Sequence, residues 1–412
     1  MSTGPPIAAP PTECDLVVVG AGILGLAVAR ELAGRHDGIR ISVLEREQRV
    51  ARHQTGSSSG VIHAGIYYTP GSLKANLCVE GAAELYEYCA ERGIHTERTG
   101  KLIVATERSE SEGLDELERR GRANGVPGLR RLDGPEIEQI EPHARGIAAL
   151  HSPSTGVVDF AEVAASFAAD LVAARGTITT ECGVIAIQEH GAGVAVTHER
   201  GVTSAGAAIT CAGAWSDRLA VAAGADPEPR IVPFRGAYLR LRPERDALVR
   251  ASIYPVPDPD LPFLGAHLTR GIDGAVLLGP TALMVGALDA YRLRRVSARD
   301  LARTLAWPGT WRLMTRHWRA GLSEIRHAAS RRALVAHMRR FVPELRAADF
   351  VAGPAGIRAQ ALGRDGALVD DFAVSRTGRA LHVRNAPSPA ATSSLPLARL
   401  IADRAEAELG IG

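Results

Sequence analysis

The hydrophobic positions near the N-terminus form an apolar run, a periodic stretch and a second apolar run. The first run extends from Leu16 to Val19, and an alanine- and leucine-rich sequence with helical spacing then continues to Arg35. The second apolar stretch lies in "IRISVLERE", where the predicted strand ends at Glu45. Because buried parallel strands read as continuous apolar runs whereas helices repeat every three to four residues, this pattern predicts a strand, a helix and a second strand.

Further along the chain, helical and strand patterns alternate without an internal repeat. Helical spacing is found in residues 81–93, 107–141 and 155–176. The charged segment 107–141 is typical of a solvated insertion. Strand patterns are found in residues 99–106, 177–217, 230–243 and 380–385. Basic helices are predicted between the last two of these, up to about residue 350.

Chain length and charge limit the fold and the partners. With 412 residues the chain exceeds the span of one hydrophobic core, so two domains are expected. The formal net charge of +2 gives no reason to expect nucleic acid as a partner. No apolar run reaches membrane-spanning length, and residues 1–13 lack both a basic region and an apolar core. This favours a disordered tail on a cytoplasmic protein.

Cysteine spacing indicates neither a disulfide framework nor a metal centre. No two cysteines have the C-x-x-C spacing of a redox or metal site. We interpret all of them as reduced packing residues and expect no metal. They are Cys14, Cys78, Cys89, Cys182 and Cys211.

Lysine is rare in this chain, since only Lys74 and Lys101 are lysine among 48 basic residues. If arginine has replaced lysine wherever either serves, a retained lysine marks a place where a compact, rotatable ammonium matters. Lys74 lies in the glycine-, serine- and tyrosine-rich stretch His53–Asn76, which makes it a functional candidate. Retention by chance is the alternative.

The glycine spacing after the first strand is that of a dinucleotide-binding turn. Gly20, Gly22 and Gly25 stand in G-x-G-x-x-G spacing between the predicted strand and helix. Such glycines allow a tight turn, a close approach to a pyrophosphate and close packing of helix on strand. Glu45, at the end of the second strand, can accept both ribose hydroxyls. The alternative is that the glycines serve only a tight turn.

Near the C-terminus, the predicted strand "ALHVRN" ends at Asn385 and is followed by a proline-containing turn. A helix is predicted to begin near Ala391. The free N–H groups and dipole of a helix start suit an electron-rich ring that becomes an anion, such as a reduced flavin. An ordinary helix capped by Thr392 or Ser393 is the alternative.

Taken together, these motifs resemble the L-2-hydroxyglutarate dehydrogenase/oxidase family of the D-amino-acid-oxidase-like FAD superfamily. The resemblance is carried by "VVVGAGILGL", "HQTGSSSGVIHAGIYYTPGSLKAN", "YPVPDPDLPFLGAHLTRGIDG", "GPAGIRAQALGRDGALVDDF" and "HVRNAPSPAATSSL". It covers the chain from about Cys14 to Ala405. It implies an FAD-dependent oxidation of L-2-hydroxyglutarate, or a close 2-hydroxy acid, to the 2-oxo acid.

The resemblance also implies an α/β (α+β) architecture in two parts. A Rossmann-like FAD-binding domain of non-contiguous segments is expected from residues 14–90, 150–230 and 350–412. A smaller substrate domain with an antiparallel sheet is expected from residues 91–149 and 231–349.

Several segments are implied to contact FAD, including the turn from Gly56 to Gly60. The expected cofactor-binding residues are Gly20, Gly22, Ile23, Gly25, Glu45, Arg46, Thr55, Ser57, Ser58, Ser59, Gly60, Val184, Ala212, Gly213, Asn385, Ala386, Pro387, Ala390, Ala391 and Thr392.

Five side chains are candidates for the chemistry. Arg358 in "AGIRA" aligns with the superfamily's carboxylate clamp, and its planar fork suits bidentate binding. His63 and His267 are candidate bases, since imidazole titrates near neutral pH. Tyr67 and Lys74 follow the flavin-contacting turn into the site. The alternatives are a structural salt bridge for Arg358 and a structural role for each histidine.

His382 is expected to support the C-terminal flavin loop. The family usually has His-Asn where this chain has Ser57-Ser58, and it also differs at Thr281 and at 286–289, where this chain reads "GALD". These departures leave the FAD assignment intact and leave the substrate more open.

Three functions remain in view for this sequence. The first is a 2-hydroxy acid dehydrogenase or oxidase that acts on a small 2-hydroxy dicarboxylate, with oxygen or a quinone as electron acceptor. The others are an amine or amino-acid oxidase of the same superfamily and a flavin-binding scaffold without turnover. Residues 311–346 hold nine arginines and two glutamates. They form either a solvated basic face or a peripheral contact with the inner face of a membrane.

Overall fold

A computed structural model describes residues 9–258 and 263–411. Residues 1–8 of the predicted tail lie outside the described residues. The described end of the tail is bound to the fold, because the Thr203 hydroxyl donates to the Pro11 carbonyl at 2.6 Å. Strand pairing begins at Glu13.

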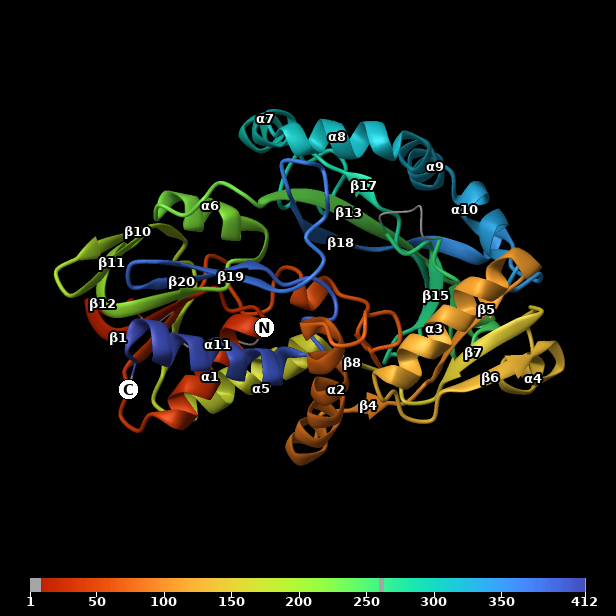
Figure 1. The fold of residues 1–412 in the computed structure, drawn as a ribbon, viewed down its shortest axis with the longest axis horizontal. Helices are drawn as coiled ribbons and strands as arrows, with labels where there is room; N and C mark the ends of the chain where they lie inside the picture. Colours follow the sequence, from red (N-terminus) through yellow and green to blue (C-terminus); the bar gives the residue numbers. More distant parts are fainter. Residues whose placement is uncertain (1–8, 259–262, 412) are drawn as a thin grey trace.

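Two large sheets stand side by side in the described part of the molecule (Figure 1). The first has eight strands, in the order β10-β11-β12-β1-β2-β9, with β20 paired to β12 and β19 paired to β20. Its members are β1 (Glu13–Val19), β2 (Ile41–Leu44), β9 (Thr177–Thr179), β10 (Val184–His190), β11 (Gly193–His198), β12 (Gly201–Thr210), β19 (Ala373–Thr377) and β20 (Ala380–Asn385). Strands β9, β2, β1, β12 and β20 are parallel neighbours.

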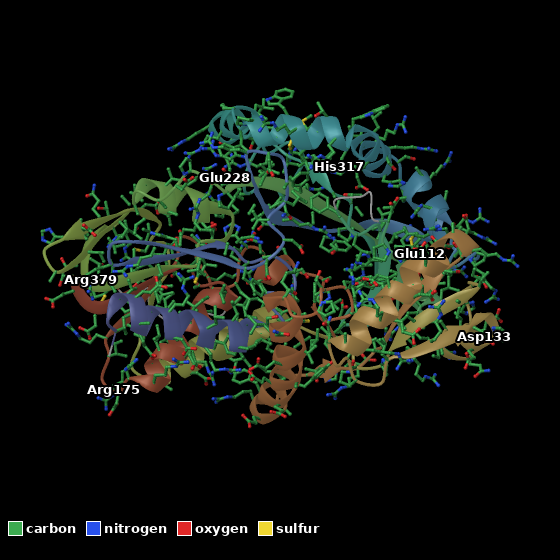
Figure 2. The ribbon with its side chains drawn as sticks, viewed as in Figure 1. Glu112, Asp133, Arg175, Glu228, His317 and Arg379 are labelled. Carbon is green, nitrogen blue, oxygen red and sulfur yellow. The ribbon has the colours of Figure 1, made fainter. Side chains whose placement is uncertain are left out.

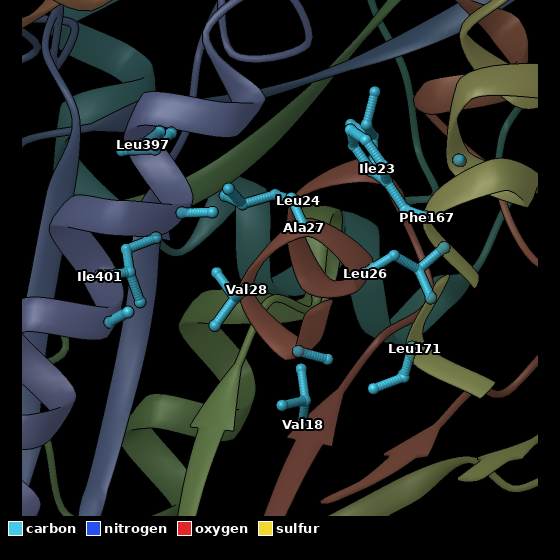
Figure 3. Packing of buried hydrophobic residues seen from close by; sticks show 14 of the residues in the cluster. Val18, Ile23, Leu24, Leu26, Ala27, Val28, Phe167, Leu171, Leu397 and Ile401 are labelled. Carbon is cyan, nitrogen blue, oxygen red and sulfur yellow. The ribbon is translucent and has the colours of Figure 1, made fainter. Parts of the chain in front are cut away.

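The predicted strand–helix–strand unit is confirmed as β1, α1 (Ile23–Arg35) and β2. Helices α5 (Phe160–Ala173) and α11 (Ser394–Leu409) pack against α1 on the same face of the first sheet. Figure 3 shows this core, in which Leu26 of α1 points toward Phe167 of α5, and Ile401 of α11 lies on the other side of α1. All three are fully buried. Their burial removes apolar surface from water and fixes α1 over the sheet.

The second sheet has nine strands and is mainly antiparallel, in the order β17-β13-β16-β15-β14-β5-β7-β6, with β18 paired to β13. Its members are β5 (Lys101–Ala105), β6 (Arg130–Asp133), β7 (Ala148–Ser152), β13 (Arg230–Leu241), β14 (Ser252–Pro255), β15 (His267–Arg270), β16 (Val276–Gly279), β17 (Leu283–Met284) and β18 (Phe350–Leu362). This confirms the mixed α/β architecture with a second, sheet-containing part.

The remaining elements cover or connect the two sheets. A small third sheet pairs β3 (Val61–Ile62) and β4 (Thr96–Glu97) with β8 (Gly156–Val158). The other helices are α2 (Leu73–Arg92), α3 (Ser111–Ala123), α4 (Gly134–Ile140), α6 (Ser216–Ala222), α7 (Ala298–Leu305), α8 (Pro308–Arg316), α9 (Trp318–Ala329) and α10 (Arg331–Met338). Helices α7 to α10 form an arc along the outer edge of the second sheet (Figure 1).

Two segments lie elsewhere than the sequence pattern indicates. Strand β18, expected in the cofactor-binding part with residues 350–412, pairs along its length with β13 in the second sheet. The segment 107–141 is not a solvated insertion: β6 joins the second sheet, and Leu114 and Leu117 of α3 are buried. In both cases, contacts with residues far away in the sequence decide where the segment lies in the fold. The division into two domains otherwise stays a proposal. Among the described helices, none is long and apolar enough to cross a membrane.

Candidate active site

A cavity of about 1750 Å³ is lined by residues of both large sheets. Its wall includes Val19 of β1 and Val383 of β20 from the first sheet, and His267 of β15 and Arg358 of β18 from the second. Helix α3 also contributes, through a face that includes Glu112, labelled in Figure 2. Pockets for drug-sized ligands measure about 300–1,000 Å³. This cavity therefore has room for a dinucleotide and a small substrate.

The glycine turn at one end of the cavity has the geometry of a phosphate site. Gly20 has φ +101°, and a Cβ there would lie 2.6 Å from the Cys211 carbonyl oxygen. A Cβ on Gly25 would overlap the Gly20 carbonyl oxygen. Gly22 meets only the Thr55 hydroxyl, which accepts the Ile23 N–H at 3.1 Å. Gly22 supplies no side-chain cap to α1, so the N–H groups at the start of this helix, other than that of Ile23, are available to a phosphate.

Glu45 lies at the same end of the cavity, with its side chain buried at the cavity wall. Its carboxylate accepts the Ala21 N–H at 2.7 Å and the Glu47 N–H at 2.9 Å. These two bonds hold it beside the glycine turn. Arg46 stacks on the Trp215 ring at 4.2 Å, and both line the cavity. Three further predicted residues line this part of the wall, namely Val184, Ala212 and Gly213.

The turn after β2 reaches the cavity through three serines. Ser57, Ser58 and Ser59 all line the wall, as the resemblance implies for a second cofactor loop. Gly60 is not among the lining residues. It has φ +73°, and a Cβ there would lie 2.7 Å from the Val158 carbonyl oxygen. Its role in this structure is therefore to let β3 approach β8.

The C-terminal loop lies on the same cavity. Strand β20 ends at Asn385, as predicted, but α11 begins at Ser394 rather than near Ala391. Neither hydroxyl considered for the cap caps this helix: Ser393 makes no cap bond, and Thr392 accepts the His63 N–H at 3.1 Å. The loop residues that line the cavity are Ala386, Pro387, Ser388, Pro389, Ala390, Ala391 and Thr392.

His267 is held in one tautomer. Its Nδ1 lies 2.9 Å from the Gly265 carbonyl oxygen, so Nδ1 carries the proton and Nε2 keeps a lone pair. The ring stacks on Tyr254, with centroids 3.9 Å apart. Burial, together with the charges of Lys101 and Arg358, lowers the pKa of His267 to about 3, although the bond to Gly265 acts in the opposite direction. A neutral imidazole with a free Nε2 can accept a proton.

His63 lies against the C-terminal loop. Its Nε2 is 3.3 Å from the Ser388 hydroxyl, and its carbonyl oxygen accepts from the Cys78 thiol at 3.4 Å. Burial lowers its pKa well below the usual value, with Lys101, His267 and Lys74 adding to the effect. The structure brings His63 and His267 to the same cavity.

The remaining candidates also line the cavity and differ in their partners. The Tyr67 hydroxyl is buried without a hydrogen-bond partner in the described part of the chain, and burial raises its pKa well above the usual value. Lys74 pairs with Asp370 at 2.9 Å. Arg358 forms no ion pair with any carboxylate of the described residues, and its guanidinium lies 5.4 Å from the Phe263 ring. The guanidinium of Arg358 is thus available to a substrate carboxylate.

The sequence patterns did not identify two residues near the site. Tyr254 lines the cavity, and Lys101 lies behind it, almost fully buried. Rarity of lysine was the one signal for Lys101, and nothing in its own segment distinguishes it from any strand residue. His382 is fully buried away from the cavity wall and bonds Thr210 of β12 and Thr377 of β19, which ties β20 to its two neighbouring strands.

The departures from the family pattern fall in two places. Ser57 and Ser58 line the cavity, whereas Thr281 and residues 286–289 are not among its lining residues. The Thr281 hydroxyl accepts the Ala237 N–H at 3.2 Å inside the second sheet. The second departure therefore changes packing rather than the cavity wall.

Two independent observations indicate that the cavity wall can hold an FAD molecule. The glycine turn at the start of α1 and the buried Glu45 carboxylate lie at one end, where a pyrophosphate and a ribose would need them. The buried Asn385 Oδ1, at the C-terminal loop, has no partner among the described residues. Unpartnered buried polar atoms call for a ligand or an ordered water.

Comparison with known families defines the class of this protein. The family described as "FAD dependent oxidoreductase" matches residues 15–404. The chain therefore belongs to the FAD-dependent oxidoreductases, and FAD is its cofactor. It is 46% identical over 409 residues to the mitochondrial L-2-hydroxyglutarate dehydrogenase of Homo sapiens, covering 95% of this chain and 88% of that one.

A bacterial relative gives the same result. The L-2-hydroxyglutarate dehydrogenase of Escherichia coli is 40% identical over 393 residues, covering 95% of this chain and 93% of that one. This chain is a member of the L-2-hydroxyglutarate dehydrogenase family. The fold is shared more widely: L-α-glycerophosphate oxidase from Mycoplasma pneumoniae superposes with a TM-score of 0.77 at 22% identity, covering 95% of this chain and 94% of that one.

Proposed function

We propose that this protein oxidises L-2-hydroxyglutarate, or a close 2-hydroxy acid, to the 2-oxo acid. The observation that carries the proposal is one cavity in which a carboxylate-binding cation, Arg358, and a neutral imidazole, His267, share a wall with the cofactor loops. The relatives at 40–47% identity support the choice of substrate. An oxidation of this kind needs an acceptor for hydride, a base for the hydroxyl proton and cations for the carboxylates.

Each of these needs has a candidate in the cavity. Bound FAD supplies the acceptor for the hydrogen that leaves C2 with its electron pair. The Nε2 lone pair of His267 receives the hydroxyl proton. Arg358 binds a substrate carboxylate through its planar fork. The unpartnered Tyr67 hydroxyl donates to a substrate oxygen.

Substrate binding also adjusts the base. A pKa of about 3 makes the free imidazole of His267 a weak proton acceptor. Two substrate carboxylates add negative charge beside it, and an opposite charge favours the protonated imidazole. The base therefore gains basicity only when the dicarboxylate is bound. His63, in contact with Ser388 of the cofactor loop, is placed to hydrogen-bond the cofactor or the substrate oxygen.

Anaerobic flavin reduction by a panel of acids tests the proposal. We expect L-2-hydroxyglutarate to bleach the purified yellow protein, and 2-amino acids to leave it oxidised. Bleaching by an amino acid instead would assign the chain to the amine oxidases of the superfamily. A flavin that no acid on the panel reduces would support a scaffold without turnover.

We propose further that α8 and α9 contact an anionic membrane surface on the cytoplasmic side, where a quinone accepts the electrons. Trp318, Leu322 and Ile325 follow helical spacing along α9 and are 56%, 57% and 52% exposed. The surface next to them carries exposed arginines, namely Arg312, Arg316, Arg319 and Arg326. His317, labelled in Figure 2, lies between the two helices. Exposed apolar side chains beside arginines are typical of helices that lie in a lipid interface.

Co-sedimentation with vesicles tests this contact. The double variant Trp318→Ser, Leu322→Ser should lose binding to vesicles of anionic lipid, because it removes the largest exposed apolar side chains of α9. Val172→Ser is the matched control, since Val172 is also 56% exposed but lies on α5. Equal binding of all three proteins, or binding to zwitterionic vesicles alone, would contradict the proposal. Oxygen consumption by the vesicle-free enzyme would show that oxygen serves as acceptor.

A further inference from the structure

Lys101 is a buried cation without a carboxylate partner. It begins β5, its exposed fraction is 1%, and among the described residues no aspartate or glutamate forms an ion pair with it. Lys74, the only other lysine, is paired with Asp370. Burial of a lone ammonium is unfavourable, since it loses hydration without a compensating charge. A methionine or leucine would fill the position with less loss of stability.

The surroundings of Lys101 connect it to the active site. Its Nζ lies 4.3 Å from the ring centroid of Tyr254 and 5.3 Å from that of Tyr67. Both tyrosines line the cavity, and Tyr254 stacks directly on His267. Lys101 itself is not a lining residue. The ammonium thus lies behind an aromatic layer, close enough to act on the cavity by its charge but unable to bind the substrate.

We propose that Lys101 is a positioning residue whose buried charge adds to the effect of burial in holding His267 and His63 in their neutral form until the substrate arrives. The inference rests on the proposed function, in which His267 receives the hydroxyl proton. Lys101 has the opposite sign to the substrate and the same sign as a protonated imidazole. Its charge therefore opposes protonation of the free enzyme and favours entry of a dicarboxylate.

The electrostatics of the cluster agree with this role. The charge of Lys101 lowers the pKa of both histidines. Burial lowers the pKa of Lys101 itself to about 8, so that the ammonium is still the main form at neutral pH.

Other groups also face the two imidazoles. The charged groups are Arg358 toward His267 and Lys74 toward His63, the Tyr254 ring covers His267, and Cys78 contacts the His63 carbonyl. Lys101 is the cation that acts on both histidines.

Three substitutions separate charge from volume. Lys101→Met and Lys101→Gln remove the charge and keep most of the side-chain length, and Lys101→Arg keeps the charge. Because the lost group is an unpaired buried charge, the melting temperature of Lys101→Met should equal or exceed that of the wild type. A residue that served only packing would lower it.

Two measurements on the FAD-loaded protein report the effect. The pH profile of kcat/KM for flavin reduction by L-2-hydroxyglutarate reports groups of the free enzyme. In Lys101→Met and Lys101→Gln its acid limb should move upward by about one pH unit, the size of effect expected for loss of a nearby unit charge. Lys101→Arg should keep the wild-type limb.

Carbon-13 histidine NMR gives a readout that does not depend on turnover. The signals of His63 and His267 are assigned by their loss in the glutamine variants, and His382, on the other sheet, is the internal reference. Both site signals should titrate at higher pH in the neutral variants while His382 stays unchanged.

The two hypotheses fail in different ways. Wild-type titration of His63 and His267 in both neutral variants would overturn the role of Lys101, whatever the activity. If L-2-hydroxyglutarate fails to reduce the wild-type flavin, the proposed function falls, and the NMR titration still decides whether Lys101 controls the histidines.

Discussion

Replacement of His267 by glutamine should lower the rate of anaerobic flavin reduction by about 10²- to 10⁴-fold, the usual contribution of a general base. Glutamine can keep a donor toward the Gly265 carbonyl, but it has no basic lone pair to replace Nε2. The variant should therefore keep its fold and its FAD while losing the proton acceptor. Stopped-flow absorbance with L-2-hydroxyglutarate measures the rate, and the flavin spectrum measures the cofactor content.

His63→Gln is the matched control for this experiment. His63 shares the cavity, but its Nε2 already contacts the Ser388 hydroxyl of the cofactor loop. We expect a smaller loss of rate from this variant, with a change in the flavin spectrum. A larger loss than in His267→Gln would exchange the two roles. If both variants reduce flavin within a few fold of the wild type, the base is not a histidine, and Lys74 or Tyr67 becomes the candidate.

The structure changes the expected pH dependence of the reaction. From the sequence, a histidine base predicts an acid limb near the ordinary pKa of imidazole. Here burial lowers the pKa of His267 to about 3. A base with a lowered pKa stays deprotonated at neutral pH and is protonated only as the pH falls toward that lower value. The limb in kcat/KM should therefore lie well below pH 6.

Local sequence patterns were sufficient for the cofactor half of the site. The strand, glycine turn and helix from β1 to α1 follow from an apolar run, three glycines and a helical period within a short segment. Strand β20 ends at Asn385 as its sequence indicates. These features depend on neighbouring residues, so a single sequence contains their determinants. The start of α11 was less well determined, because the loop before it is held from outside, through Thr392 and the His63 backbone.

The catalytic half depends on contacts that no local pattern contains. The partner of Lys74 is Asp370, 296 positions away. Strand β18 carries Arg358 into the second sheet by pairing with β13, although its sequence is contiguous with the cofactor segment. Lys101 acquires its role from Tyr67 and Tyr254, which come from other segments. Sequence identified the residue types that the chemistry needs, and tertiary packing decides which of them meet.

Arg358→Ala should weaken binding of the substrate or its transition state by about 2–5 kcal/mol while FAD stays bound, the range found when one partner of a buried charge pair is removed. At about 1.4 kcal/mol per factor of ten, this is roughly a 30- to 4,000-fold loss in kcat/KM. The reason is that no carboxylate among the described residues pairs with Arg358, so that its charge is available to the substrate. Unchanged kinetics would place the carboxylate-binding cation elsewhere in the cavity.

Lys74→Ala should affect substrates differently from Arg358→Ala, because Lys74 is the candidate cation for binding the second carboxylate of a dicarboxylic acid. We expect a loss of up to the same size for L-2-hydroxyglutarate, and a much smaller loss for a monoacid such as 2-hydroxybutyrate. The pair with Asp370 provides the control, since Asp370 is 91% exposed and competes with the substrate for the ammonium. Asp370→Asn should therefore lower the KM for the dicarboxylate if Lys74 binds it. If Lys74→Ala affects the dicarboxylate and the monoacid equally, Lys74 only anchors the loop that carries Asp370, and discrimination between the two substrates arises from another residue.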